Sequence, residues 1–595
     1  MPYLPSLNEG VQARSVVEQF GGYNHNLRIN EGEWYDDLNL TSDYFPMFAR
    51  RKPRTQYRGD VADPQGILAK DALAWVDGPT LFYNGLPVSG LILSTRENDC
   101  PKQLVSMGAY IIIWPDAKYV NTKDLTDCGS LGAQFSSVTD ARVTFTPCRL
   151  DGSEYEGLTV SSTAPSGPAN GAYWMDTSSS PHVLKQYSAS SAAWVEVATT
   201  YVRIGVNGIG TNFAEFDGVT LSGIRYTGSN EAVKAQLEDL NTDVILYGVG
   251  EDYIIVTGVL DEAYTQTSGS VSVERVIPRM DYICESNNRL WGCYYGMSSA
   301  GTLNEIYACK LGDPKNWHCF MGLSTDSYMV SVGTDGAFTG AIAHAGYPLF
   351  FKEGCVHKMY GSYPGNYQLQ TTTCRGVQKG SWRSLVIVNE VLYYKSRQDV
   401  CAYDGSLPVG VSEQLGNDEY YYGAVAGAFD GKYYIAMKTA SGSQRLFVYD
   451  TVRGLWHKET PIDAVGFAAM DDSLMALHGN VIQDLNGMVG MQAEGEVIWS
   501  ATSGLIGYEM IDQKYVSRFN LRLRMTPGSE CNLYIQYDSD GVWQHQGTVV
   551  QSGTDSWVLP VIPRRCDHFM LRLEGNGDVK IYSMAKIIEQ GSDAV

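Results

Sequence analysis

The side chains that most often carry out catalysis or bind metals are dispersed along this sequence. Its 9 His stand singly, without the H-E-x-x-H pattern or the His and Cys spacing that binds zinc. A G-x-S-x-G nucleophile elbow, a P-loop and a dinucleotide fingerprint are also absent, and 205–210 is only a glycine-rich turn. The sequence therefore predicts no catalytic, cofactor-binding or metal-binding residue, and no enzyme.

Two short segments resemble functional motifs but favour structural roles. The Asp-Ser-Asp-Gly sequence at 538–541 could begin a calcium loop, but no Glu stands at the twelfth position, which favours a hairpin turn. The Asp-Pro-Lys-Asn-Trp sequence at 313–317 favours a turn whose Trp317 anchors the edge of a sheet. Paired carboxylates about 5 to 9 Å apart, as glycosidases need, cannot be read from sequence.

One basic cluster lies near the N-terminus, in a chain of net charge −22. Its members are Arg50, Arg51, Lys52, Arg54 and Arg58. Two interpretations stay open: a solvated arm, or an arm that docks into an acidic neighbouring subunit.

Length and composition limit the class of protein. A chain of 595 residues is too long to form a single hydrophobic core, so about three or four domains are expected. With 11% aromatic residues, 62 Gly and 18% charged residues, the chain is expected to be folded and mostly β. The net negative charge excludes a protein that wraps nucleic acid, but it is compatible with a channel wall past which DNA slides.

Other expectations concern location and thiols. No apolar run approaches the about 20 residues of a membrane-spanning helix, and residues 1–10 show no secretory signal, so folding in a cytoplasm is expected. The 12 Cys include no C-x-x-C pair, which predicts reduced and buried thiols.

A repeat dominates the middle of the chain. Each unit has a turn residue, an apolar strand, a short turn and a second strand, often ending in Tyr-Asp. Strands starting near 348, 391, 432 and 473 match the spacing of four-stranded propeller blades. Segments 79–85, 108–120 and 288–295 resemble the same unit. The sequence predicts that Trp456 fills the groove between two blades.

The repeat is interrupted once and then ends. A helix over 231–240, capped by Ser229 or Asn230, lies among short strands of a predicted inserted module. After about 495, alternating strands such as 518–525 indicate a β-sandwich. The predicted domains are an N-terminal docking arm (1–70), the first part of a β-propeller (71–125), a small α+β module (126–278), the remainder of the propeller (279–495) and a C-terminal β-sandwich (496–595).

Several segments carry a family resemblance: 21–29, 33–47, 50–54, 288–292, 311–317 and 571–579. They resemble the β-propeller tail-nozzle, or tail-stabilisation, proteins of short-tailed phages of gut bacteria. The resemblance covers the N-terminal segment, the ring and the sandwich, whereas the module at 126–278 has no counterpart in it.

The resemblance implies a structural virion protein, assembled in the host cytoplasm and located in the tail. It implies a homo-oligomeric ring, a hexamer, attached to an adaptor or portal ring, with phage DNA passing through its channel without specific binding. We hypothesise that the net charge of −22 repels DNA from this lumen. The alternatives are a carbohydrate-binding host-adhesion tail protein and, second, a propeller glycan hydrolase.

Overall fold

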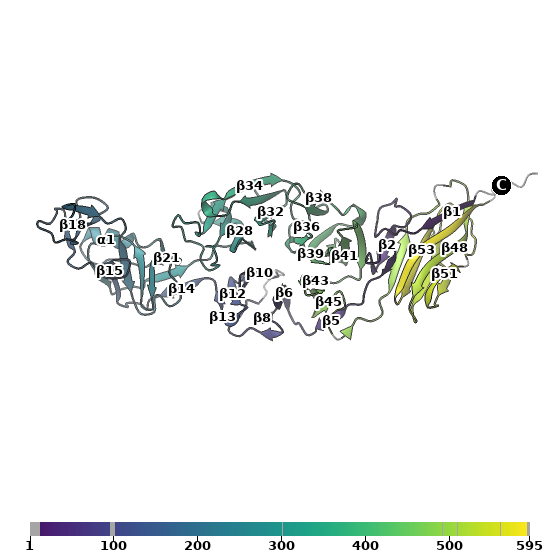
Figure 1. Ribbon diagram of the computed structural model, residues 1–595, viewed down its shortest axis with the longest axis horizontal. Coiled ribbons are helices and arrows are strands. Elements are labelled where there is room, and N and C mark those ends of the chain that lie inside the picture. The colour runs from purple at the N-terminus through teal and green to yellow at the C-terminus, as the bar shows by residue number, and fades with distance from the viewer. Residues whose placement is uncertain are drawn as a thin grey trace, which may run out of the picture.

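The protein is mainly β and has three parts in a row. The computed structural model describes residues 12–95, 101–299, 301–488, 490, 492–507, 510–559 and 561–591. Figure 1 shows an inserted module at one end, a β-propeller in the middle and a β-sandwich at the other end. The predicted fold class, a propeller interrupted by an α+β module and followed by a sandwich, is confirmed. Among the described residues, no helix is long and apolar enough to cross a membrane.

In the part of the chain that the structure describes, the propeller has seven blades. Blades 1 to 3 are β6 (Pro64–Lys70), β7 (Ala72–Asp77), β8 (Thr80–Tyr83) and β9 (Leu86–Pro87); β10 (Gln103–Met107), β11 (Tyr110–Trp114), β12 (Lys118–Asn121) and β13 (Asp124–Ser130); and β27 (Tyr282–Ser286), β28 (Arg289–Ser298), β29 (Gly301–Ala308) and β30 (Tyr328–Ser331).

The later blades follow in chain order. Blades 4 to 6 are β31 (Gly340–His344), β32 (Tyr347–Lys352), β33 (Cys355–Tyr360) and β34 (Gln368–Thr373); β35 (Val386–Val388), β36 (Val391–Lys395), β37 (Val400–Tyr403) and β38 (Val409–Gly410); and β39 (Tyr421–Phe429), β40 (Lys432–Thr439), β41 (Gln444–Asp450) and β42 (Leu455–Glu459). Blade 7 contains β43 (Ala464–Met470), β44 (Ser473–His478), β45 (Val481–Asp484) and β46 (Gln492–Ala493). Single 3-10 turns lie between strands: η1 (Pro364–Asn366), η2 (Trp382–Ser384) and η3 (Glu413–Leu415).

The ring is closed by a strand from the N-terminal side. Strand β43 of blade 7 contacts β6 of blade 1, which brings the first and last blades together. Strand β5 (Thr55–Arg58) pairs with β45 on one side and β46 on the other, so blade 7 contains chain from both ends of the propeller. This pairing fixes the last blade to the first because β5 leads directly into β6.

Tight turns explain why the repeat is visible in the sequence. The second strands of four successive blades, β32, β36, β40 and β44, begin at 347, 391, 432 and 473, which confirms the predicted spacing. Two-residue turns precede all four, and both turn residues have positive φ in three of them: Ala345 and Gly346 (φ 50° and 80°), Asn389 and Glu390 (φ 48° and 67°), and Asp430 and Gly431 (φ 48° and 70°). Positive φ at both central residues is the type I′ geometry that joins twisted antiparallel strands.

The inserted module lies between blades 2 and 3. It contains β14 (Ala133–Ser136), β15 (Val143–Cys148), β16 (Thr159–Ser161), β17 (Tyr173–Asp176), β18 (Val183–Ser188), β19 (Ala193–Glu196), β20 (Tyr201–Gly205), β21 (Gly218–Ser222), β22 (Asp243–Ile245), β23 (Gly248–Gly250), β24 (Tyr253–Thr257), β25 (Tyr264–Gln266) and β26 (Ser272–Arg275). Its helix α1 (Glu231–Glu238) is capped by the Asn230 side chain, one of the two predicted caps, and buries Val233 and Leu237.

The sandwich has two sheets that share one core. One sheet contains β1 (Gln12–Val17), β3 (Leu40–Thr41), β4 (Phe48–Arg50), β48 (Lys514–Met525), β51 (Gly553–Leu559) and β53 (Val579–Gln590). The other contains β2 (Trp34–Leu38), β47 (Trp499–Ser503), β49 (Glu530–Tyr537), β50 (Gln544–Val549) and β52 (Phe569–Asn576). Along β48, Phe519, Leu521 and Leu523 are buried while Arg522 and Arg524 are exposed, which matches the predicted alternation.

The N-terminal segment differs from the separate docking arm predicted over 1–70. Strands β1 to β4 complete the sandwich, and β5 completes blade 7. Strands β1, β2, β4 and β5 pair with strands more than 400 residues further along the chain, so local sequence does not reveal this pairing, whereas β3 pairs with the nearby β4.

Gly22 allows the N-terminal segment to lie against blade 6. The backbone N–H of Tyr23 donates to the carbonyl oxygen of Trp456 at 2.6 Å, and the Trp456 side chain is fully buried. A Cβ at Gly22 would stand 2.1 Å from that oxygen. Gly22→Ala is therefore expected to destabilise the protein by about 1–3 kcal/mol, as overpacking does. Urea unfolding followed by tryptophan fluorescence measures this change.

The matched control for this prediction is Gly354→Ala. A Cβ at Gly354 meets no atom within 4 Å. Equal unfolding midpoints for the two variants would contradict the close approach at Gly22.

Candidate functional site

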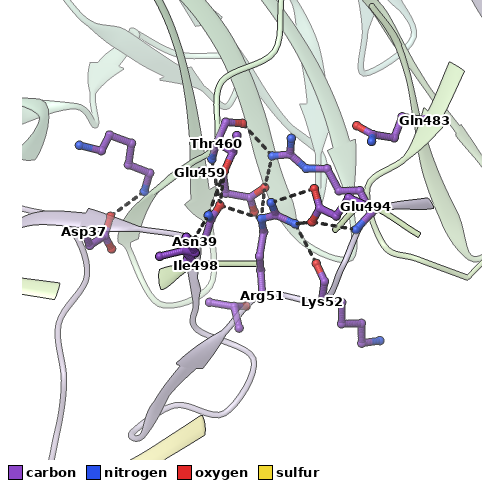
Figure 2. Close-up of polar contacts among 12 residues, drawn as sticks. Asp37, Asn39, Arg51, Lys52, Glu459, Thr460, Gln483, Glu494 and Ile498 are labelled. Carbon is purple, nitrogen blue, oxygen red and sulfur yellow. Dashed lines mark hydrogen bonds and ion pairs between the residues drawn. The ribbon is translucent and has the colours of Figure 1, made fainter. Parts of the chain in front are cut away.

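Charged side chains are concentrated where the propeller meets the sandwich. Figure 2 shows Arg51, Asn39, Glu459, Thr460 and Glu494 in contact at this junction. Glu459 ends β42, the outer strand of blade 6, and Glu494 follows β46 of blade 7. The arginines lie on the short connection between β4 of the sandwich and β5 of blade 7, so two blades and the sandwich meet here.

Arg51 is buried and contacts four groups, one of which is Glu459, whose Oε2 lies 3.5 Å from the Arg51 Nε. Its guanidinium makes a two-pronged ion pair with Glu494, with Nη2 to Oε2 at 3.3 Å. Its Nε donates to Asn39 Oδ1 at 2.8 Å, and Nη1 donates to the Lys52 carbonyl at 2.9 Å. Arg51 thus fixes the position of blade 7 relative to the chain segment that leaves the sandwich.

Arg54 is 1% exposed and contacts blade 6. Its Nη2 donates to Glu459 Oε2 and to the Thr460 carbonyl, both at 2.9 Å. Burial lowers the pKa of Arg54, and the negative charge of Glu459 opposes that shift. The guanidinium therefore depends on Glu459 for its charge balance.

Asn39 links the arginines to the loop after β42. Its backbone has a positive φ of 58°, a conformation that Asn adopts more readily than most residues. The Asn39 amide group donates to Thr460 Oγ1 at 2.9 Å and to the Ile498 carbonyl at 2.8 Å. Its Oδ1 accepts from the Thr460 N–H at 2.9 Å. Next to it, buried Asp37 accepts hydrogen bonds from His457 and from the Lys458 N–H.

The charge of Glu494 makes this junction sensitive to acid. Burial alone would raise its pKa, but the hydrogen bond and charge of Arg51 outweigh burial and hold the pKa of Glu494 below its usual value. The stabilisation is therefore complete above the unfolded-state pKa of about 4.3 and is lost as the pH falls through the lower folded-state pKa.

Glu494→Gln is expected to remove this pH dependence. The variant should be about 1–3 kcal/mol less stable than the parent protein at pH 7, the range for a hydrogen bond between charged groups. The gap should shrink as the pH falls below 4. Urea unfolding of both proteins from pH 7 to pH 3 measures the gap, and a constant gap would contradict the role of the Glu494 charge.

Two members of the basic cluster, Arg51 and Arg54, are therefore paired with carboxylates inside this chain, whereas Lys52 is exposed. Both interpretations from sequence, a solvated arm or docking into a neighbouring subunit, are wrong for Arg51 and Arg54, because Glu459 and Glu494 supply the acidic partners. Arg58 lies over the stacked rings of Trp75 and Phe82, with its Cζ 5.2 Å and 5.5 Å from their centroids.

The segment 313–317 connects the propeller to the inserted module. Trp317 is buried, as predicted for an anchoring residue. Asn316 donates from Nδ2 to the Phe216 carbonyl at 2.6 Å and accepts from the Gly218 N–H at 3.3 Å. Within the module, Arg275 pairs with Asp217 at 2.6 Å.

The remaining candidate motifs have structural surroundings. Residues 538–541 form the turn after β49, where Asp538 Oδ1 accepts from the Asp567 N–H at 2.7 Å. No group of three or more His, Cys, Asp or Glu within the described ranges could hold a metal ion. The eleven described Cys are free and nine are buried, while Cys100 lies outside the described residues. Burial raises the pKa of Cys401 to about 12, which keeps this thiol protonated.

A polar cavity of about 940 Å³ lies between blades 5 and 6. Its walls are the turn between β36 and β37 and the connection from β38 through η3 to β39. The sequence does not reveal it, because its residues come from four separate stretches and form no local motif.

Two carboxylates of the cavity are fixed by arginines. Asp399 pairs with Arg375, and its Oδ1 accepts from Ser396 Oγ at 2.6 Å. Glu419 accepts from Arg445 Nη2 at 2.9 Å and from the Tyr421 hydroxyl at 3.0 Å. These carboxylates are oriented and their charges are balanced.

Comparisons with known proteins give a fold likeness alone. No family model and no curated protein matches the chain. One matching solved structure is described as an engineered GH43 glycoside hydrolase with endo-xylanase and exo-arabinofuranosidase activity; it is 10% identical with a TM-score of 0.19, over 52% of this chain and 97% of that chain. Another, described as a glycoside hydrolase, is 12% identical with a TM-score of 0.18, over 51% and 96%.

The prediction that the chain is not an enzyme is corrected by this comparison, since the matching structures are glycoside hydrolases. The physical reason is that the two carboxylates of a glycosidase come from separate strands and leave no contiguous motif. Absence of a sequence motif therefore does not exclude enzymes of this class. The low identities and TM-scores assign no catalytic residue to this chain.

Proposed function

We propose that this chain is a ring-forming structural protein of a short phage tail, the tail nozzle. In this proposal it attaches to an adaptor or portal ring, and phage DNA passes along the ring axis. The buried arginine junction is the observation that carries the proposal. Domains joined by one chain move relative to one another by default, whereas Arg51 and Arg54 fix the sandwich to two blades. A subunit with a rigid domain junction is suited to a tail component that must keep its shape while DNA moves through it.

Two further features support this proposal. The resemblance of segments such as 33–47 and 571–579 points to the same protein class. The net charge of −22 would repel DNA phosphates and keep friction in the channel low.

Electron microscopy of the purified full chain tests the proposal. Six-fold rings with an axial hole are the expected result. Monomers at every concentration, including samples mixed with a candidate adaptor ring, would contradict it. Rings whose channel wall is basic would contradict the repulsion of DNA while leaving ring formation intact.

A second candidate function is glycan hydrolysis, and the oriented carboxylates of the cavity favour it. Asp399 and Glu419 line one polar cavity that an exposed Tyr420 also lines. Glycosidases place two such groups on either side of the scissile bond. Release of reducing sugar from a polysaccharide, abolished in Asp399→Asn and Glu419→Gln, would assign this activity; no release from a broad polysaccharide panel would remove it.

A further inference from the structure

The cavity between blades 5 and 6 contains cations that have no carboxylate partner. Asp399 and Glu419 are neutralised by Arg375 and Arg445. Within the described ranges, Lys395 and Arg397 form no ion pair. Glu413 is the remaining carboxylate of the lining, so the unpaired charges are two positive and one negative. The cavity therefore favours an anionic ligand.

Lys395 is the buried cation of this site. Lys395 is 3% exposed, and its Nζ donates to the Ser396 carbonyl at 2.6 Å. An ammonium has three donors, so two N–H groups are left for an occupant of the cavity. Burial lowers the pKa of Lys395 to about 8, so the amine is still mostly protonated at pH 7. A buried ammonium without a carboxylate partner gains most from an incoming anion.

The rest of the lining suits a sugar ring. Tyr420 is 51% exposed, and its hydroxyl accepts from Gln378 Nε2 at 2.7 Å, which fixes the position of the phenol. An exposed aromatic ring in a polar cavity offers a flat apolar surface beside hydrogen-bonding groups. Asn417 and Gln398 also line the cavity and can bind hydroxyl groups.

We infer that this cavity binds an acidic saccharide, with its carboxylate on Lys395 and Arg397 and its pyranose ring on Tyr420. The ligand class rests on the glycan-directed second candidate above, but the inference requires neither hydrolysis nor ring assembly. It places a sugar-binding site on the propeller.

Calorimetric titration with trigalacturonic acid and with its methyl ester tests the inference. The two probes differ in charge and share the sugar rings. The acid is expected to bind at least about tenfold more tightly, the factor for one charged hydrogen bond of about 1.4 kcal/mol. Lys395→Met and Arg397→Ala should remove that preference, whereas Tyr420→Ala should weaken both probes.

Controls separate this result from other failures. Arg397 is exposed, so Arg397→Ala should keep the fold even where Lys395→Met does not. Arg522→Ala, on the distant sandwich, should bind like the parent protein. Equal affinity for acid and ester, no saturation by either probe, or unchanged binding in Arg397→Ala would overturn the inference. Electron microscopy of the same samples scores ring formation independently, and recovery of intact saccharide separates binding from hydrolysis.

Discussion

Replacing Arg54 by Met is expected to lower the free energy of unfolding by about 3–5 kcal/mol, the cost of breaking a buried ion pair by removing one partner. The variant removes the closer cation of Glu459, at 2.9 Å, and leaves this carboxylate, which is 7% exposed, with the Arg51 Nε at 3.5 Å. It also leaves the Thr460 carbonyl without its guanidinium donor. Urea unfolding at pH 7, followed by tryptophan fluorescence, measures the loss.

A double variant shows whether the weakened charge pairing of Glu459 is the cause. Arg54→Met with Glu459→Met removes both charges and should recover most of the lost stability, because two apolar side chains replace the pair. Arg522→Met on the exposed face of β48 is the control and should change stability by less than about 0.5 kcal/mol. If the double variant were as unstable as the single one, shape rather than charge would hold the junction together.

The repeat could be predicted from sequence because its signals are local. Turn residues such as Asn389 and Asp430 stand directly before the second strand of each blade, and their positive φ explains why Asn, Asp and Gly recur there. Trp456 packs against Phe447 and Tyr449 as a groove-filling residue, with its Nε1 donating to the Val411 carbonyl at 2.8 Å. Helix α1 was visible for the same reason, since its cap and apolar spacing lie within ten residues.

The junction could not be predicted because its two halves lie far apart in the chain. Five basic residues within nine positions were visible as a cluster, but nothing near them shows that Glu459 and Glu494 complete it. The same limit applies to β1, whose partner β53 lies at the other end of the chain. Pairing between distant strands depends on the whole fold, whereas pattern analysis sees one strand at a time.

The cavity was missed for a related reason. Lys395 ends a strand that reads as an ordinary blade strand, Val391–Lys395, and a lysine at that place predicts an exposed end. In the folded chain Lys395 is 3% exposed and lines the same cavity as Leu415 of η3 and Tyr421 of β39. Whether the charge of Lys395 is buried and unpaired depends on how the blades pack, so only the structure reveals it.

Closure of the ring by β5 leads to the second large expected effect. Gln56 lies between two strands, opposite Gln483 of β45 and Gln492 of β46. Proline has no N–H to donate and is excluded from the interior of a sheet. Gln56→Pro is therefore expected to cost about 3 kcal/mol or more, from the lost ladder bond and the unpaired groups left on the neighbouring strands. Blade 7 should detach from blade 1, and limited proteolysis should cut between them.

Gln56→Ala is the matched control, because it removes the same side chain and keeps the backbone N–H. It should resist protease like the parent protein and unfold within about 0.5 kcal/mol of it. Electron microscopy of Gln56→Pro then shows whether a subunit with an open propeller still assembles into oligomeric rings. Unchanged proteolysis and stability in Gln56→Pro would mean that contacts between β43 and β6 hold the ring shut without the N-terminal strand, which would contradict closure of the ring by β5.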